Sequence, residues 1–430
     1  MTGNIHSCEN REEQQAEAKI LEVEIMLLQI KIKNYKSIGG EIIFDLVAGS
    51  GSELKDHLFI EENNMKALPT IAIFGANASG KTNFIDAIYD MCHNIIDSHN
   101  YDENSTIHVT PYLFDQNLRS QPTEFEIFFS LNDGKEYKYG YKATTGHVLE
   151  EWLHVRKLSK NNTKWLHIFN RKDHEINCDE RYKDLSSYCE RINNKKLLLS
   201  YVGKFSPDPV FSEIYNWFSL LFLINVKTLN NDLQKMIDLC INLYSKDESR
   251  KDFLLKFIKE FDHSIEGINI KDERSNNGMM KRKVYTIHKD KEYPLDIESD
   301  GIKKLFVCCA IWYEHLKNKS GVFIADELDS QLHPLVTRRI VRMYNDEEHN
   351  EKRSQLIFTS HNLVIMDNQE LRRDAIWFTK KNKNDFTELC SLAEVKVING
   401  QEVRADLNYE KNYLAKNLKI GYSKENNPNN

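Results

Sequence analysis

The stretch IAIFGANASGKTNFIDAI, residues 71–88, decides the fold. It passes from a β-branched apolar segment into a loop framed by glycines, and then into a pattern whose apolar residues recur at helical spacing. From Gly75 to Thr82 the loop matches G-x-x-x-x-G-K-[ST] in full. A strand, a glycine-framed loop and a helix in this order predict a phosphate-binding loop in an α/β protein.

Each residue type in this loop has a physical reason. Glycines let backbone N–H groups turn inward around phosphates, and the N-terminus of the next helix adds partial positive charge. We expect Lys81 to bridge the β- and γ-phosphates of ATP and the Thr82 hydroxyl to bind Mg²⁺. A chance glycine loop is the alternative, and the placement of strand, lysine and threonine argues against it. The predicted nucleotide-binding set of the loop is Gly75, Asn77, Ser79, Gly80, Lys81, Thr82 and Asn83.

A second segment supplies acidic groups. In GVFIADELD, residues 321–329, an apolar strand ends in Asp326 and Glu327. Carboxylates at the C-terminal end of a strand lie where α/β sheets bind ligands. We therefore expect Asp326 to hold Mg²⁺, directly or through water, and Glu327 to act as the general base on the attacking water. Taken alone, the pair would suggest only a solvated strand end.

ESDGIKKL precedes FIADELDSQLHP, and LIFTSHN follows it. This order of motifs resembles the ABC-type ATPase heads of the SMC, RecF and OLD group. The resemblance implies an ABC-type P-loop head with a mixed sheet, flanking helices, an antiparallel β subdomain and a helical insertion.

Four further site residues follow from this resemblance. Ser299 and Gly301 correspond to the signature at a helix N-terminus, Asp329 to the D-loop, and His361 to the switch histidine that contributes to catalysis. Asp300 departs from the common L-S-G-G signature. The simpler readings are a helix N-cap for Ser299 and a core histidine for His361. Gln116 is the nearest candidate for a Q-loop residue.

A narrower resemblance covers nearly everything after Met26. It is carried by the segments LLQIKIKNYKSIGGEIIFDL, GANASGKTN, PTEFEIFF, ESDGIKKLF, ADELDSQLHP, TSHN and LRRDAIWFTKK. With these segments the chain looks like the RloA/AbiL-type AAA family ATPases of bacterial anti-phage defence, including the ATPase subunit of PARIS systems. This resemblance implies a Mg²⁺-dependent ATPase of low basal rate that forms homo-oligomers and acts as sensor, scaffold or switch. It also implies a separate effector such as a Toprim-like nuclease, because the roughly 50 residues at the C-terminus are too few for such a domain. DNA or a phage protein is the expected trigger.

Two other functions stay open. A RecF- or SMC-like ATPase of DNA repair or chromosome maintenance would bind DNA through clustered basic residues. An ABC-like regulator would change conformation with negligible turnover. A ring-forming AAA+ ATPase and a small GTPase are disfavoured, because we find no C-terminal lid domain and no N-K-x-D motif in the expected place. The basic candidates are Lys31, Lys33, Lys36, the MKRK segment at 280–283, Arg338, Arg339, Arg372 and Arg373.

Composition sets the outer limits. The 430 residues carry a net charge of −7, which argues against nucleic-acid binding over the whole surface. The eight cysteines contain no C-x-x-C pair, so we expect neither zinc nor disulfides, as in a reducing cytosol. No apolar run is long enough to cross a bilayer, so a cytoplasmic protein is expected.

The chain divides into four predicted parts. Residues 1–25 form an N-terminal extension, with Met1 or Met26 as the start, and 26–159 form the N-terminal half of the head. Residues 160–262 are a mostly helical insertion, and 263–430 contain the signature, acidic pair, D-loop and switch histidine. Asp133-Gly134 between two strand patterns predicts a hairpin.

Overall fold

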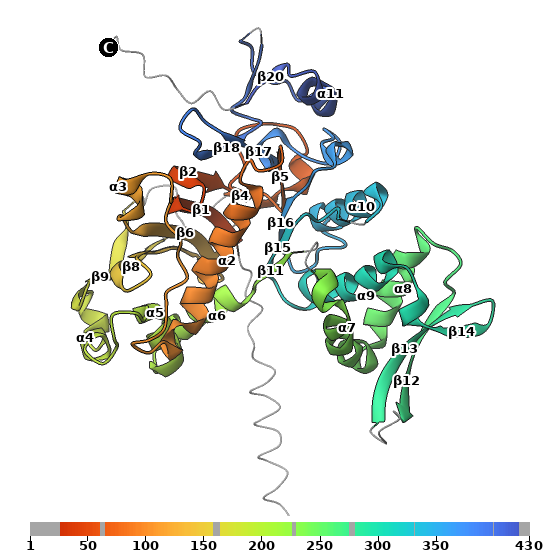
Figure 1. Cartoon of the computed structure of the whole chain (residues 1–430), viewed down its shortest axis with the longest axis horizontal. Helices are drawn as coiled ribbons and strands as arrows, with labels where there is room; N and C mark the ends of the chain where they lie inside the picture. Colours follow the sequence, from red (N-terminus) through yellow and green to blue (C-terminus); the bar gives the residue numbers. More distant parts are fainter. Residues whose placement is uncertain are drawn as a thin grey trace, which may run out of the picture.

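The computed structural model describes residues 26–60, 65–157, 164–225, 229–274, 280–330, 332–398 and 400–420. Two large sheets form its centre, with helices packed around them (Figure 1). The predicted α/β class is confirmed. In the described ranges, no helix combines the length and apolarity that crossing a bilayer requires.

The loop at residues 75–81 follows the central strand of a six-stranded sheet with the order β11-β15-β16-β5-β17-β18. The first five strands are parallel, and β18 is antiparallel to β17. Because parallel strands end at the same edge, the residues that follow β5, β15 and β16 meet there. The strands are β5 (Thr70–Gly75), β11 (Leu221–Asn225), β15 (Val322–Asp326), β16 (Gln355–Thr359), β17 (Ile376–Lys381) and β18 (Thr387–Ser391).

The second sheet is antiparallel, with the order β10-β9-β8-β7-β6-β1-β2. The predicted hairpin around Asp133 and Gly134 connects two of its strands in register. Gln355 joins the two sheets: its buried side chain accepts a hydrogen bond from Leu27 N at 2.7 Å and donates to Leu27 O at 3.1 Å. The strands are β1 (Met26–Tyr35), β2 (Ile38–Asp45), β6 (Thr123–Leu131), β7 (Lys135–Ala143), β8 (Val148–Lys157), β9 (Leu166–Lys172) and β10 (Glu175–Cys178).

Two helices flank the parallel strands. The helix α2 (Lys81–Asp97) contacts β5 and β15, α10 (Pro334–Asn345) contacts β5 and β16, and Figure 1 shows them on opposite sides. A third helix, α9 (Asp300–Tyr313), packs with α7 (Leu229–Lys246) and α8 (Glu248–Lys259). A three-stranded sheet extends from this group: β12 (Gly267–Arg274), β13 (Met280–His288) and β14 (Lys291–Pro294).

The remaining α-helices have at most 11 residues, and the remaining strands form two-residue pairs. They comprise α3 (Gln116–Arg119), α4 (Leu185–Cys189), α5 (Leu198–Phe205), α6 (Pro209–Ser219), α11 (Tyr409–Leu414), and the strand pairs β3 (Phe59–Ile60) with β4 (Lys66–Ala67) and β19 (Lys396–Val397) with β20 (Leu418–Lys419).

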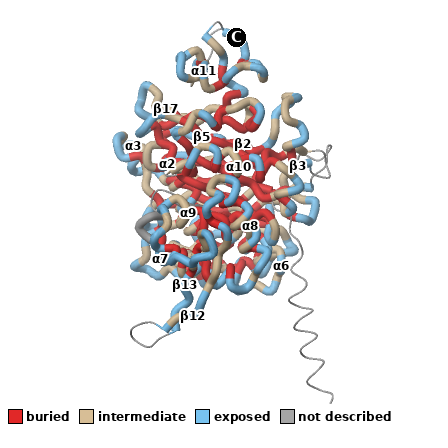
Figure 2. Tube along the Cα trace, turned by 90° about the vertical axis from the view of Figure 1, so that its right-hand side faces the viewer, coloured by how far each residue is buried: buried red, intermediate tan, exposed pale blue. Residues whose placement is uncertain are grey.

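One apolar core runs through both sheets and the helices between them, as the buried band in Figure 2 shows. At its centre Phe44 of β2 lies 4.9 Å, ring to ring, from both Phe84 of α2 and Trp377 of β17. Such aromatic pairs contribute about 0.5–1.5 kcal/mol each beyond the burial of their area. The core thus fixes the loop's helix against strands from distant parts of the chain.

Residues 160–262 contain helices, α4 to α8, as expected for this part of the chain, and also three strands. β9 and β10 extend the antiparallel sheet, and the apolar run from Trp217 divides between α6 and β11. A short apolar run does not distinguish strand from helix by periodicity. Here the pairing of β11 with β15 makes the second part of this run a strand. Residues 1–25 lie outside the described residues.

Candidate nucleotide-binding site

The phosphate loop lies directly against β17 and β18. Gly80 has φ 110°, and a Cβ atom there would lie 2.1 Å from Thr387 Oγ1. A Cβ at Gly75 would lie 2.3 Å from Thr379 Oγ1. Both framing positions therefore require glycine, because a larger residue would push the loop off the sheet.

The N-terminus of α2 is open to an anion. Its N-cap residue is Gly80, which has no side chain to cap the first N–H groups. Residues 76–78, with Asn77 at their centre, form an exposed tip, whereas Ser79 and Lys81 are buried. Free amides at the start of a 17-residue helix suit a polyphosphate.

The Lys81 amine lies back against its own loop. Nζ donates hydrogen bonds to the carbonyl oxygens of Gly75 at 2.7 Å and of the next residue at 3.2 Å. Burial lowers the pKa of this amine, and the negative charges of Asp326, Glu327 and Asp329 offset part of that decrease. The structure thus brings the loop lysine within electrostatic range of the three predicted acids in one chain.

Thr82 and Asp326 meet at the predicted metal site. Thr82 Oγ1 donates a 3.0 Å hydrogen bond to Asp326 Oδ2, across 244 positions of sequence. Thr82 is exposed and Asp326 is buried. Hydroxyl and carboxylate oxygens are ligands that Mg²⁺ takes together with waters and substrate phosphates. The donor set therefore fits a Mg²⁺ ion that arrives with a nucleotide.

Glu327 has φ 54°, a backbone conformation that non-glycine residues rarely adopt. Its N–H donates a 2.8 Å hydrogen bond to the Thr359 hydroxyl. Strain of this kind costs on the order of 1–3 kcal/mol and is typical of functional sites. The hydrogen bond to β16 holds Glu327 in this conformation at the edge where the loop lies.

His361 and Asp329 lie at the same edge of the sheet. Ser360, the residue before His361, donates its N–H to Ile73 O on β5 at 3.1 Å. The His361 side chain is exposed and is therefore not a buried core histidine. Asp329 follows β15 in a turn closed by a 2.8 Å hydrogen bond from Ser330 N to the residue 327 carbonyl.

Ser299 is the N-cap residue of α9, and Gly301 lies in the first turn of this helix. The Ser299 hydroxyl accepts a 3.3 Å hydrogen bond from Ile302 N and so caps the helix. Figure 1 shows α9 on the opposite side of β15 from α2. Ser299 therefore acts as the N-cap of α9, and the residue is also exposed.

Comparison with known proteins decides the family. A family model described as "AAA domain, putative AbiEii toxin, Type IV TA system" matches residues 71–367, more than half of the chain. The chain belongs to this AAA-domain family. The matched span begins in β5 and ends beyond the TSHN segment, so it contains the loop, Asp326, Glu327 and His361.

Three solved SMC heads are similar to this AAA protein at low identity. A head bound to the C-winged helix domain of ScpA has 13% identity and TM-score 0.47, covering 85% of this chain and 97% of that chain. A head from Thermotoga maritima has 15% identity and TM-score 0.41, and the match covers 85% of this chain and 98% of that chain. The third is a head from Pyrococcus furiosus with an extended coiled coil, bound to the C-terminal domain of ScpA. It has 14% identity and TM-score 0.42, and the match covers 85% of this chain and 96% of that chain. No curated protein matches the sequence.

Hydroxyl groups that the sequence analysis missed brace the loop of this AAA domain. Ser79 Oγ lies 2.6 Å from Thr379 Oγ1, and Thr387 Oγ1 donates to Ser79 O at 3.0 Å. Asn83 Nδ2 donates to Ser37 Oγ in the β1–β2 turn at 2.7 Å. The side chains of Ser79 and Asn83 thus hold the loop in place. The sequence signals these contacts only by the threonines on the strands next to the loop.

Most of the basic residues considered for DNA have acidic partners in the structure. Such pairs reduce the positive field that a phosphate backbone would meet. The pairs are Lys31–Glu126, Lys36–Asp86, Lys281–Asp238, Arg282–Asp272, Lys283–Glu273, Arg338–Glu370, Arg339–Glu260, Arg372–Asp374 and Arg373–Glu53.

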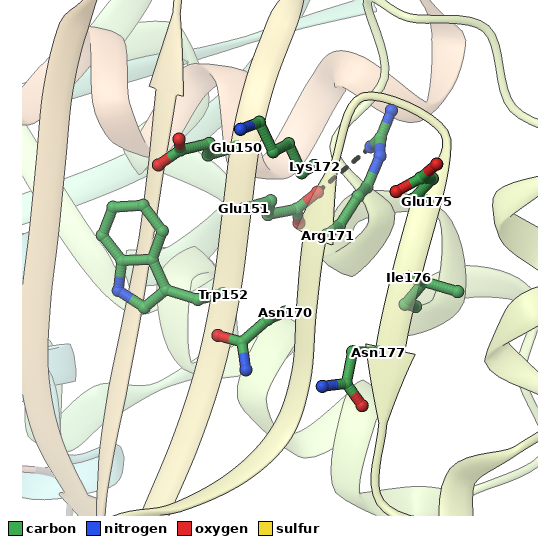
Figure 3. Close-up of a pocket in the computed structure, with 9 residues that line it drawn as sticks. All are labelled: Glu150, Glu151, Trp152, Asn170, Arg171, Lys172, Glu175, Ile176 and Asn177. Carbon is green, nitrogen blue, oxygen red and sulfur yellow. Dashed lines mark hydrogen bonds and ion pairs between the residues drawn. The ribbon is translucent and has the colours of Figure 1, made fainter.

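A pocket lies on the antiparallel sheet, and Figure 3 shows the residues that line it. Inside it Arg171 and Glu151 form a buried ion pair at 3.2 Å. Glu151 also accepts hydrogen bonds from Leu198 N at 2.7 Å and Leu199 N at 2.9 Å. The pair therefore anchors the N-terminus of α5 and has a structural role. Gln116, the Q-loop candidate, is exposed on α3, and its role stays a prediction.

Proposed function

We propose that this chain is a Mg²⁺-dependent ATPase of low basal rate whose nucleotide state acts as a switch. The observation that carries the proposal is the Thr82–Asp326 hydrogen bond at 3.0 Å, beside the lysine of a complete phosphate loop. A carboxylate and a hydroxyl from segments 244 residues apart are paired at the sheet edge where α/β folds bind ligands.

Each residue then has a distinct task. The amides of α2 and the Lys81 ammonium bind phosphate oxygens, which carry the negative charge of the substrate. Thr82 and Asp326 would hold Mg²⁺, which would neutralise further phosphate charge. Glu327 accepts the proton of the attacking water, and His361 senses the terminal phosphate and helps to position that water.

A second copy of the chain would complete the site. Ser299 and Gly301 start α9 on the far side of β15 from α2, so these residues reach a nucleotide most simply from another subunit. An α9 N-terminus with its partial positive charge would then face the γ-phosphate bound by the partner, with Asp329 at the contact. ATP binding would join two heads, and hydrolysis would release them.

The biological setting that we propose is bacterial anti-phage defence, with a separate effector such as a nuclease and a trigger such as DNA or a phage protein. The family description, which names a toxin of a type IV toxin–antitoxin system, supports a protein that acts in such a pair. The alternative is a RecF- or SMC-like ATPase of DNA maintenance. The ion pairs of most basic candidates favour the first setting, because they leave less positive charge for DNA.

The test is phosphate release by the purified chain together with its mass in solution. We expect slow Mg²⁺-dependent release that disappears in Lys81→Ala, and a larger assembly with a non-hydrolysable ATP analogue. Release that persists in Lys81→Ala would come from a contaminant. Absence of Mg²⁺–ATP binding in the wild type would refute the proposal.

A further inference from the structure

The Thr359 hydroxyl makes two hydrogen bonds at the centre of the candidate site. It donates to Asp326 Oδ1 at 2.6 Å and accepts from Glu327 N at 2.8 Å. Both its donor and one acceptor position are therefore used. The side chain is fully buried, so water does not compete for these bonds.

Sheet order explains why this residue reaches both acids. β16 lies between β15, which ends at Asp326, and β5, which leads into the phosphate loop. Thr359 is the last residue of β16, and its carbonyl oxygen also accepts a 3.1 Å hydrogen bond from Leu328 N. Three consecutive residues, 326 to 328, are thus bonded to this one threonine.

The two oxygens of the Asp326 carboxylate have different partners. Oδ2 accepts from Thr82 on the loop side, and Oδ1 accepts from Thr359. A carboxylate held at one oxygen cannot rotate freely, so its other oxygen keeps a fixed direction toward Thr82. The bond to Glu327 N stabilises the left-handed backbone at that residue.

We propose that Thr359 is a positioning residue that fixes Asp326 for Mg²⁺ and Glu327 for water activation. The proposal rests on the ATPase function proposed above. It also links the metal ligand to His361, which lies two residues further along the same segment. Outer partners of metal ligands typically change metal affinity or activity by about 10- to 100-fold when removed.

Thr359→Val keeps the shape of the side chain and removes the hydroxyl. We expect the Mg²⁺ concentration for half-maximal binding of a fluorescent ATP analogue to rise about 10- to 100-fold. Affinity for the same analogue in EDTA should stay within about threefold of wild type, because the loop and Lys81 are unchanged. Thr359→Ser keeps the hydroxyl and should restore the wild-type Mg²⁺ requirement.

Thr337→Val on α10 is the matched control. Thr337 is fully buried like Thr359, but its hydroxyl makes no hydrogen bond to the described residues. The same substitution there should leave the Mg²⁺ requirement unchanged. If Thr359→Val melts below the assay temperature, Thr359→Ala takes its place with the same expected shift.

Three results would overturn the proposal: an unchanged Mg²⁺ requirement in Thr359→Val, a Thr359→Ser variant as impaired as the valine variant, or an equal loss of affinity in EDTA. Turnover separates this inference from the function on which it rests. A wild type that binds Mg²⁺–ATP without Lys81-dependent phosphate release would refute hydrolysis alone, and the Mg²⁺ titration would still test Thr359.

Discussion

The Lys81 amine donates a 2.7 Å hydrogen bond to the carbonyl oxygen of Gly75, six residues earlier in its own loop. The buried ammonium thus finds acceptors within the loop, which offsets part of its desolvation. A bound phosphate offers charged oxygens instead, and hydrogen bonds between ionised groups are roughly twice as strong as neutral ones.

Lys81→Ala should therefore abolish measurable nucleotide binding. Removing one member of a close charge pair costs about 2–5 kcal/mol, which corresponds to at least a 30-fold loss of affinity. Calorimetric titration with Mg²⁺–ATP measures this loss. Lys33→Ala, at an exposed lysine on β1, is the control and should bind as wild type.

Glu327→Gln should separate binding from chemistry. A glutamine cannot accept the proton of the attacking water, so phosphate release should fall about 10²- to 10⁴-fold. Nucleotide affinity should be equal or higher, because one negative charge near the phosphates is lost. Release at the wild-type rate would show that Glu327 is not the base.

His361→Ala should spare nucleotide binding and slow hydrolysis by about 10²-fold. Because the side chain is exposed, the melting temperature should stay within about 1 °C of wild type. Single-turnover phosphate release with saturating ATP gives the rate. A loss of binding as large as that of Lys81→Ala would contradict the assigned role.

Two substitutions of Ser299 separate its capping role in α9 from a role at the nucleotide bound by a second copy of the chain. Ser299→Ala removes the cap bonded to Ile302 N and should cost about 1 kcal/mol of stability. Ser299→Asn keeps the cap, because Asn and Ser are similar N-caps, but lacks the hydroxyl. We expect both variants to lose the ATP-dependent increase in mass. Assembly by Ser299→Asn at the wild-type level would leave Ser299 only its cap.

Glu370 should make stability depend on acid pH. Burial raises the pKa of this carboxyl, but Arg342 and Arg338, which donate hydrogen bonds to it, lower it by more than burial raises it. The net pKa of Glu370 is therefore below its ordinary value of 4.5. A depressed pKa contributes stability above the unfolded value, and this contribution is lost as the pH falls through the folded value.

Glu370→Gln should thus lower the free energy of unfolding by about 1.5–3 kcal/mol at pH 7. Its deficit against wild type should shrink as the pH falls below 4.5. Urea unfolding at several pH values measures both. The control is Glu394→Gln at an exposed position, and an equal deficit there would contradict a specific role for the buried carboxylate.

Local patterns located much of the fold and of the site. The strand, loop and helix at residues 70–97 follow from glycine placement and apolar periodicity, and the strands that end at Asp326 and Thr359 follow from short β-branched runs. β9, β10 and β11 were missed. β9 and β10 lie at the edge of a sheet: burial alternates little along β9, and no residue of β10 is buried. β11 is identified as a strand by its pairing with β15.

The sequence by itself determined which chemical groups are present: a phosphate loop with Lys81, an acidic pair at a strand end and a histidine after the next strand. These signals are short-range, because each motif needs only its neighbours in the chain. Only the tertiary structure decided that Thr359 holds both acids and that Ser79 and Asn83 brace the loop. These hydrogen bonds depend on strand order, which places β16 between β15 and β5, and no local pattern encodes that order.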